Sequence, residues 1–582
     1  MALSTPSESP AVVVREIDLT SGVPNVQSTT GAFVGNFRWG PIGERRQVSN
    51  EAELVNTFAN PDSYNTIDFH TAAYFLRYTS NLQVARQATS AVKTAFGSLF
   101  QTPADSDASG TSLPINNKLA FDGAKTALET QGYSFIARYP GELGNSLKVS
   151  ICPGADSSGA LFNGWTYKSS FDGFPQTSTY ASNRSGIEDE IHLAVIDNDG
   201  KFTGTAGTVL ETYPYQSQAS DAKSADGSSI FIKDVVNANS EYVFFVNAID
   251  SSHANFGQPV VASRDFGGTK TTDIEFASGV NSAILTASEV ASGYDLFEDK
   301  DIVEIDFLIA PDATSTAHTT IVNDLVATAE ARKDCVVAAS PKRSDVVGVT
   351  SSATITTNLQ TTANALTNSS YLVLDGNYLK VYDKYNDQYI QIPASSSTAG
   401  LMAATDRDRA PWFSPAGQRR GRYLGVTTID YVPTKSQRDT LYKAGVNPVA
   451  NIPGQGIILF GDKTKLARPS AFDRINVRRL FLVLERAIGR AAESVMFEFN
   501  DEFTRSEFVN IVEPVLREVQ GRRGITDFRV VCDTTNNTPA VIDRNEFIAS
   551  IFIKPARSIN YVTLNFVAVR TGVDFEEVVG TV

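Results

Sequence analysis

The sequence predicts a chain of several α/β and α+β domains, in which a β-rich segment interrupts an α/β part. At 582 residues the chain exceeds the size at which one hydrophobic core stops growing. Strand and helix patterns alternate in two separate stretches, and the sequence between them is rich in Ser, Thr, Gly, Asn and Asp. We expect the divisions 1–25, 26–95, 96–300, 301–405, 406–572 and 573–582.

The first segment, residues 1–25, has the pattern of one strand between flexible ends. Residues 11–19 are rich in β-branched side chains, and Ser21-Gly-Val-Pro24 ends the run. A terminal strand can close the sheet of its own chain, or it can be donated to another chain. The residues themselves leave both possibilities open.

Residues 26–95 and 301–405 both read as α/β sequence. In the first stretch we expect a buried strand at 30–37 and a helix at 68–78. In the second we expect a strand at 305–310, a helix at 319–332 and a strand at 335–339. Strand, helix and strand in this order predict a parallel crossover, so the two stretches could form one interrupted domain.

The interrupting segment, residues 96–300, consists of short strand patterns separated by turn residues. Strands are expected at residues 191–196, 229–233 and 241–246. Acidic residues outnumber basic ones from 188 to 312. We interpret the segment as one or two inserted β-rich domains that face outward.

The C-terminal part, residues 406–572, opens its patterned region with a long amphipathic helix. Arg479, Arg486 and Arg490 fall on the side opposite the apolar stripe. The spacing of three and four residues that defines this stripe is kept by Val477, Leu480, Phe481, Leu484, Ile488, Ala491 and Val495.

A second helix and three strands complete the C-terminal part. Thr504 and Glu507 have the spacing of a capping box, Pro514 predicts a kink, and Gly521 predicts the end of the helix. Strands are expected at residues 527–532, 546–554 and 560–570, before the short acidic and apolar tail at 573–582.

Residues 463–490 are locally basic, with eight Lys and Arg residues against two acidic ones. This surplus can be an ordinary solvated surface, or it can be a face that meets an acidic partner. The chain as a whole carries a net charge of −15. That charge argues against nucleic acid as a direct partner, because binding to phosphates requires a basic surface.

The remaining composition indicates a cytoplasmic protein without a membrane span. No stretch approaches the roughly 20 apolar residues that a membrane helix needs, and the N-terminus lacks the pattern of a secretory signal. The three cysteines, Cys152, Cys335 and Cys532, are too far apart in the sequence for a zinc motif or a disulfide framework. We expect buried thiols.

The motifs of catalytic chemistry are missing from the sequence. Pro453-Gly-Gln-Gly456 lacks the Lys of a phosphate loop, and Asp197-Asn-Asp-Gly-Lys201 is followed by Thr208 where a calcium loop has its glutamate. We read the latter as a hairpin turn. The four histidines are not spaced as metal ligands, and Gly-x-Ser-x-Gly does not occur. We expect no catalytic residue, no metal and no cofactor.

Several long sequence blocks carry a family resemblance. Gly31-Ala-Phe-Val-Gly-Asn-Phe-Arg-Trp-Gly-Pro41 and Ile475-Asn-Val-Arg-Arg-Leu-Phe481 are two of them, and the others lie at residues 9–16, 137–148, 411–417, 452–462 and 553–560. Together they resemble the tail sheath proteins of large contractile-tailed phages. The resemblance covers both ends and the C-terminal third, and it is weakest between about 150 and 300.

The resemblance implies a structural subunit without enzymatic activity. Such subunits form hexameric rings that stack helically around an inner tail tube, and the assembly contracts to drive the tube through the host envelope. The implied partners are other copies of the chain, the tail tube protein, and the baseplate and tail terminator proteins. The implied location is the virion tail, assembled in the host cytoplasm.

The resemblance also implies arms that link neighbouring subunits through an α/β sheath core. The N-terminal arm would contain Val12, Val13, Val14 and Ile17, and the C-terminal arm Phe575, Val578 and Val579. The receiving sheet would contain Phe547, Ile551, Ile553, Val562, Leu564 and Phe566. Arg479, Arg486 and Arg490 would form a basic surface facing the tube.

Two alternatives remain at this point. Another virion shell protein, such as a tail tube or capsid subunit, would share the low catalytic content and the terminal arms. A surface-binding or glycan-active protein could use the β-rich insertion, although such proteins usually show repeats or paired acids.

Overall fold

The computed structural model describes residues 29–97, 114–130, 133–154, 159–247, 253–313 and 317–560. The chain divides into two compact units. The large unit contains Pro24–Pro411 and Pro415–Ala487, and the small unit contains Met1–Val23, Trp412–Ser414 and Ile488–Val582. Among the described residues, no helix is both long and apolar enough to span a bilayer.

A seven-stranded sheet forms the centre of the large unit. The strand order is β17-β13-β12-β11-β1-β3-β2, and all neighbours are parallel except β2, which is antiparallel to β3. Strands from before and after the insertion therefore lie in one sheet, and the expected parallel crossover is present. The strands are β1 (Gly31–Gly35), β2 (Arg45–Val48), β3 (Leu82–Arg86), β11 (Phe307–Ile309), β12 (Val336–Ala339), β13 (Leu372–Asp375) and β17 (Val446–Asn447).

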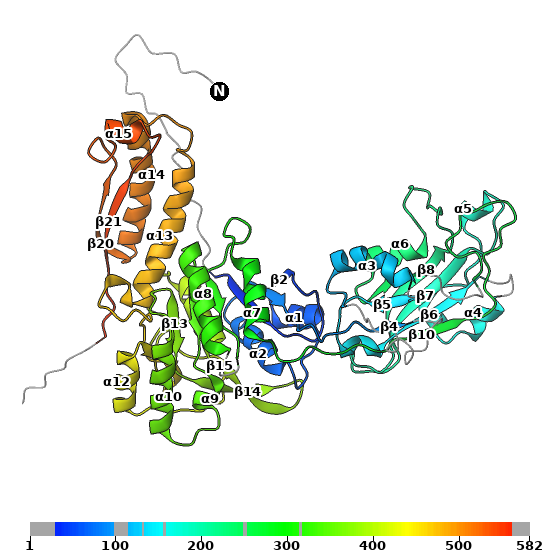
Figure 1. Cartoon of the computed structure of the whole chain (residues 1–582), viewed down its shortest axis with the longest axis horizontal. Helices are drawn as coiled ribbons and strands as arrows, with labels where there is room; N and C mark the ends of the chain where they lie inside the picture. The colour runs from blue at the N-terminus through cyan, green and yellow to red at the C-terminus, as the bar shows by residue number, and fades with distance from the viewer. Residues whose placement is uncertain are drawn as a thin grey trace, which may run out of the picture. The chain divides into compact units, whose positions relative to one another are not determined.

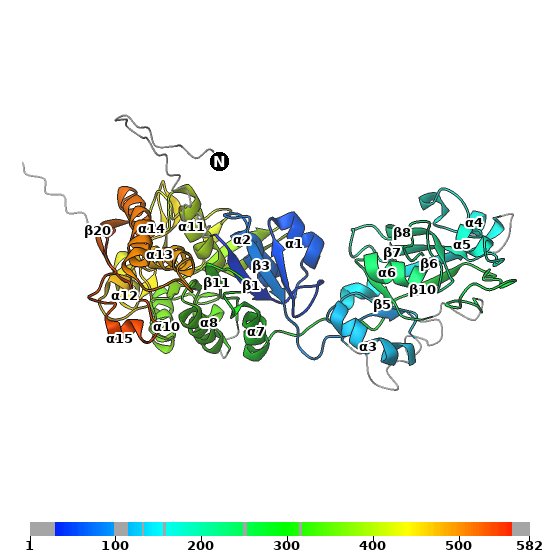
Figure 2. The same ribbon diagram turned by 90° about the horizontal axis from the view of Figure 1, so that it is seen from above.

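Helices cover both faces of this sheet, as Figure 2 shows from above. Successive strand residues point to opposite faces, so Phe33 joins one apolar cluster while Ala32 and Val34 join the other. The central strands are apolar throughout because both faces are buried. One face packs against α1 (Glu51–Phe58), α2 (Thr66–Phe75), α11 (Ser395–Asp408) and the first part of α13 (Ile475–Glu493), and the other against α7 (Ala287–Tyr294), α8 (His318–Arg332), α10 (Ser352–Ala365) and α12 (Lys435–Lys443).

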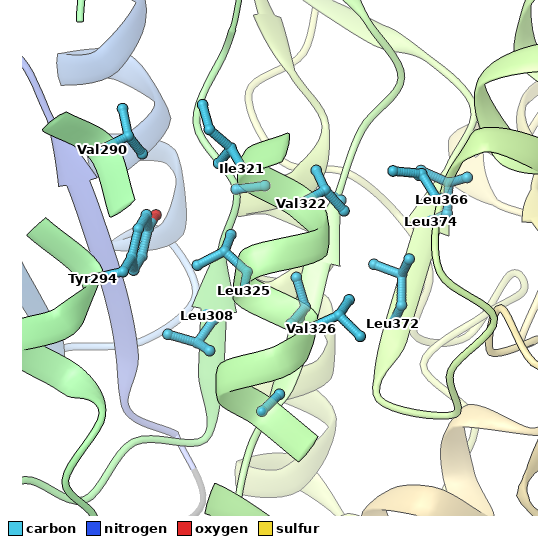
Figure 3. Packing of buried hydrophobic residues seen from close by; sticks show 14 of the residues in the cluster. Val290, Tyr294, Leu308, Ile321, Val322, Leu325, Val326, Leu366, Leu372 and Leu374 are labelled. Atoms are coloured by element: carbon cyan, nitrogen blue, oxygen red, sulfur yellow. The ribbon is translucent and has the colours of Figure 1, made fainter. Parts of the chain in front are cut away.

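Helix α8 shows how the sequence pattern builds this core. Ile321, Val322, Leu325 and Val326 recur at helical spacing, are each at most 3% exposed, and pack with Leu308 of β11 in one cluster (Figure 3). The helix begins one residue before the expected range and ends where expected. The period of three and four residues was therefore a sufficient signal for this element.

A buried polar cluster lies at the C-terminal ends of β12 and β13. Asp375, the last residue of β13, is fully buried. Its Oδ2 accepts hydrogen bonds from Ser340 Oγ at 3.0 Å and from Thr398 Oγ1 at 3.2 Å. Burial raises the pKa of the Asp375 carboxyl to about 7, although these hydrogen bonds oppose the shift.

Asp375 is expected to make the stability of the large unit depend on pH. A carboxyl whose pKa is raised by folding favours the folded state while it is protonated, so its contribution is complete below about pH 4 and is lost as the pH rises to about 7. The loss is about 1.4 kcal/mol per pH unit for one such group. Asp375→Asn should make the free energy of unfolding in urea less dependent on pH between pH 4 and 7 by about this amount, while Asp68, whose pKa burial also raises to about 7, keeps its own contribution.

The insertion contains two sheets that enclose an apolar cluster. Strands β4 (Phe96–Gly97), β5 (Phe135–Ala137) and β9 (Val243–Phe245) form one sheet, and β10 (Thr272–Glu275), β6 (Leu147–Pro153), β7 (Glu190–Asp197) and β8 (Thr208–Ser217) form the other in this order. Its helices are α3 (Lys118–Thr130), α4 (Ala160–Gly164), α5 (Thr179–Ser182) and α6 (Ile232–Asn239), with 3-10 helices η2 (Glu142–Ser146) and η3 (Lys168–Ser170).

Two of the three strands expected in the insertion are present, and the third is wrong. Residues 191–196 and 241–246 correspond to β7 and β9, whereas residues 229–233 make only isolated bridges before α6 begins at Ile232. Ile232 and Val236 lie one helical turn apart and are both buried in the insertion's core, so a helix satisfies this apolar pair. The expected turn after Asp197 joins β7 and β8 as an antiparallel hairpin.

The rest of the large unit consists of short elements around the main sheet. Two small sheets are formed by β15 (Gln388–Pro393), β14 (Tyr378–Asp383) and β16 (Thr428–Ile429), and by β18 (Val449–Ile452) and β19 (Gly456–Leu459). The remaining helices are α9 (Arg343–Val346), η4 (Asp295–Phe297) and η5 (Ala471–Asp473). All three cysteines of the chain are buried free thiols, as the sequence predicted.

Candidate functional site

The described part of the small unit is built around helix α14 (Glu502–Gly521) and a two-stranded sheet, which lie side by side in Figure 1. Asp501 caps the helix by accepting a hydrogen bond from Thr504 N at 2.9 Å. The expected cap at Thr504 is therefore wrong, because Asp501 starts the helix three residues earlier. Pro514 lies inside the helix, as expected.

The sheet consists of β20 (Ile525–Val531) and β21 (Ser550–Pro555), which run antiparallel. Phe528 lies opposite Ile553, and Val530 lies opposite Ile551. These four side chains are half-buried on one face of the sheet, whereas the alternate face exposes Arg529, Phe552 and their polar neighbours. The helix contributes to the same core with Phe508, Val512, Leu516 and Val519.

The residues expected to receive a strand lie in two different environments. Ile551 and Ile553 belong to β21. Phe547 precedes β21, and its ring packs edge-on against Phe508 of α14 with centroids 5.4 Å apart. The expected strand at 546–554 therefore begins later, at Ser550, because Phe547 serves the helix contact. Val562, Leu564 and Phe566 lie outside the described residues.

Each strand of this sheet has one edge without a partner strand within the described ranges. A two-stranded sheet is marginally stable alone, and an open edge presents backbone N–H and C=O groups that another strand can pair with. The exposed face also carries Phe552, which is 60% exposed. The sheet thus has the geometry of an acceptor for further strands. The arm residues Val12, Val13, Val14, Ile17, Phe575, Val578 and Val579 all lie outside the described residues.

Arg479 and Arg486 do not form the exposed basic face that the sequence predicted. Arg479 is 4% exposed, forms an ion pair with Asp406, and donates a hydrogen bond to Met402 O at 3.1 Å. Residues 475–480, the first part of α13, are all buried, and Arg479 pairs there with an acid of the same unit.

Arg486 is held in a similar way. Its guanidinium lies 2.8 Å from Asp306 Oδ1 and donates to Asp334 O at 2.9 Å. Arg490 is half-buried and belongs to the small unit. A role of Arg490 toward a tail tube stays a prediction.

The family relationship of the chain follows from comparison with known proteins. The model of the phage tail sheath protein central domain matches residues 293–465, and that of the phage tail sheath C-terminal domain matches residues 467–568. The tail sheath protein of Vibrio phage KVP40 is 32% identical, and the match covers 98% of this chain and 99% of that protein. The chain belongs to the phage tail sheath proteins.

Further relatives agree with this assignment. The tail sheath protein of Enterobacteria phage T4 is 33% identical, with 98% of this sheath chain and 99% of the relative covered. The crystal structure of a sheath tail protein from Desulfitobacterium hafniense matches with a TM-score of 0.51 at 12% identity, over 94% of this chain and all of that chain. This structural match shows that the two chains share a fold.

The sheath assignment confirms the resemblance drawn from the sequence blocks. The chain is a structural subunit of a phage tail sheath. The match to sheath proteins runs over nearly the whole chain, so we reject the alternatives of a tube or capsid subunit and of a surface-binding or glycan-active protein. The C-terminal sheath model begins at residue 467 and thus includes α14 and the β20–β21 sheet.

Within the described ranges, no group of three or more His, Cys, Asp or Glu side chains could hold a metal ion.

Proposed function

We propose that this sheath protein polymerises through strands donated between subunits and performs no catalysis. The observation that carries the proposal is the β20–β21 sheet, whose outer edges have no partner strand among the residues that the structure describes. Residues 12–17 would add to it as the N-terminal arm of a neighbour, and residues 575–579 as the C-terminal arm. The half-buried side chains of Ile551 and Ile553 lie on one apolar face of the sheet, and strands added at its edge would extend this face.

Strand addition would give a connection strong enough to persist while other contacts change. Each net main-chain hydrogen bond contributes roughly 0.5–1.5 kcal/mol, so about five of them contribute several kcal/mol before side-chain burial is counted. Ser21-Gly-Val-Pro24 and Thr571-Gly572 would act as the flexible joints beside the two donated strands.

The complete assembly would consist of hexameric rings stacked around the tail tube. On a signal from the baseplate it would contract and drive the tube through the host envelope, while the donated strands keep neighbouring subunits joined. Its other contacts would then have to be bistable, so that the extended form persists until contraction is nucleated. The baseplate, tail terminator and tube proteins are the further partners, and assembly would take place in the host cytoplasm.

Deleting residues 2–19 is expected to abolish polymer formation and leave a folded monomer. The deletion removes the apolar run at 12–17 that would complete a neighbour's sheet. Sedimentation velocity and negative-stain microscopy measure the polymer, and circular dichroism with thermal melting measures the fold.

A matched control deletes only residues 2–8, the polar tip that precedes the apolar run. This variant should polymerise like the full chain. The proposal fails if the 2–19 deletion also forms normal cylinders, or if both deletions prevent assembly equally.

A further inference from the structure

The segment between α13 and α14, together with the first turn of α14, exposes four large apolar side chains that are close in the sequence. Met496 is 58% exposed, Phe497 104%, Phe499 85% and Phe503 77%. Single exposed apolar residues are common on protein surfaces, but a continuous group of this kind marks an interaction site. We call residues 496–503 the aromatic loop.

The aromatic loop is held in a fixed shape by polar contacts. Asn500 Nδ2 donates to Glu546 O at 2.7 Å, and Asn500 Oδ1 accepts from Arg505 Nε at 2.8 Å. Phe497 has a φ of 69°, a left-handed backbone conformation that bulky residues rarely adopt. The loop is thus organised before any partner binds, which reduces the entropy lost on binding.

The charges of the loop restrict what can cover it. Glu498, Asp501 and Glu502 are exposed between the apolar side chains. The chain's terminal segments, residues 1–28 and 561–582, each contain three acidic residues and one basic residue, so like charge disfavours them here. A fitting partner surface is basic and also exposes an apolar side chain.

Such a surface lies at the other end of the same small unit. Arg523 and Arg557 are exposed. The hydrogen bond from Ala556 N to Gly524 O, at 3.1 Å, brings the two segments that carry them together. Ile559 beside them is 83% exposed. The 20 residues of α14 separate this basic end from the aromatic loop by about 30 Å.

We propose that the aromatic loop of one subunit docks onto the basic end, Arg523, Arg557 and Ile559, of a second copy. The inference rests on the proposed polymerisation and adds a contact that does not involve the arms. Because the two surfaces differ, the contact is heterologous, and each subunit keeps one free surface of each kind. Repetition of such a contact builds either a closed ring or an open helical array, depending on the rotation between neighbouring copies.

Charge reversal with rescue tests this contact in the full-length chain. Glu498→Arg with Glu502→Arg, or Arg523→Glu with Arg557→Glu, should each raise the protein concentration needed for polymers by about tenfold or more. The four changes combined in one chain should restore assembly toward the wild-type concentration. Asp501 is left unchanged because it caps α14.

The apolar part is tested with Phe497→Ser and Phe499→Ser together. The control is Leu119→Ser, which alters an 80% exposed apolar residue outside the small unit. Polymer formation, followed by light scattering and microscopy, should weaken in the first variant alone. Circular dichroism should show both variants to be folded.

The outcomes separate this contact from the arm exchange. The docking proposal is overturned if both charge-reversed chains assemble normally, or if assembly is lost and the fourfold variant does not restore it. The arm-exchange proposal is then still decided by the arm deletions alone. If only binding to a different tail protein is lost, the loop's partner is not a second copy and the proposal is also overturned. A third outcome is normal assembly of the 2–19 deletion, combined with loss of assembly in the charge-reversed chains and its rescue in the fourfold variant. That outcome would reject the arm exchange and support docking of the aromatic loop.

Discussion

Replacing Arg479 by Met is expected to lower the free energy of unfolding of the large unit by about 3–5 kcal/mol. The Asp406 side chain is 3% exposed, so the substitution removes the Arg479 charge that pairs with a buried carboxylate. The guanidinium also lies 4.6 Å from the ring centroid of Phe307, a contact that Met replaces in part. Urea unfolding followed by amide hydrogen exchange in α11 and α13 measures the change.

The double variant Arg479→Met with Asp406→Leu separates charge from packing. Removing both ions should recover much of the lost stability, because apolar pairs of similar volume often replace a buried ion pair without loss. Arg46→Ala is the exposed control in the same unit, since Arg46 pairs with Glu44 and its side chain is 48% exposed. That change should stay within about 1 kcal/mol. A single Arg479 variant as stable as the wild type would contradict the expectation.

Leu325→Ala is expected to destabilise the large unit by about 2–5 kcal/mol. Leu325 is fully buried in α8, in one cluster with Leu308 of the central sheet (Figure 3). Truncation removes its transfer free energy and leaves a cavity that neighbours on the sheet and in α8 fill only partly. Urea unfolding of this variant measures the expected loss of stability.

Ile284→Ala provides the surface control, because Ile284 is 74% exposed. Its effect should stay within about 0.5 kcal/mol. Equal losses in the two variants would mean that burial of Leu325 does not stabilise the sheet as described.

The parallel core was predictable from sequence because its signals are local. The apolar run at 335–339 and the helical spacing at 319–332 each report burial directly, and their order indicates a parallel connection. Some helix and strand boundaries in the structure differ from the expected ones by a few residues, and at helix ends the capping residue decides the position. Asp501 and Thr504 both suit a helix start, and only the packing of Thr504 inside the unit selects Asp501.

The environment of the α13 arginines could not be predicted in this way. Arg479 and Asp406 are 73 residues apart in the sequence, and Arg486 and Asp306 are 180 apart. Helical periodicity places an arginine on a side of its helix, but it does not reveal an acid that another element brings there. The aromatic loop was also missed, because the identity of Phe497 and Phe499 does not by itself reveal that their side chains are exposed.

The pairing of β1 with β11 has a consequence for the order in which the chain can fold during synthesis. Gly31 lies beside Phe307, so the first strand waits for 276 further residues before this neighbour exists. At translation rates of roughly 5–20 residues per second, that wait lasts roughly 14–55 s. The insertion closes its own sheets within the interval, so it is expected to be the first part of the nascent chain to resist protease, with the central sheet completed only after it.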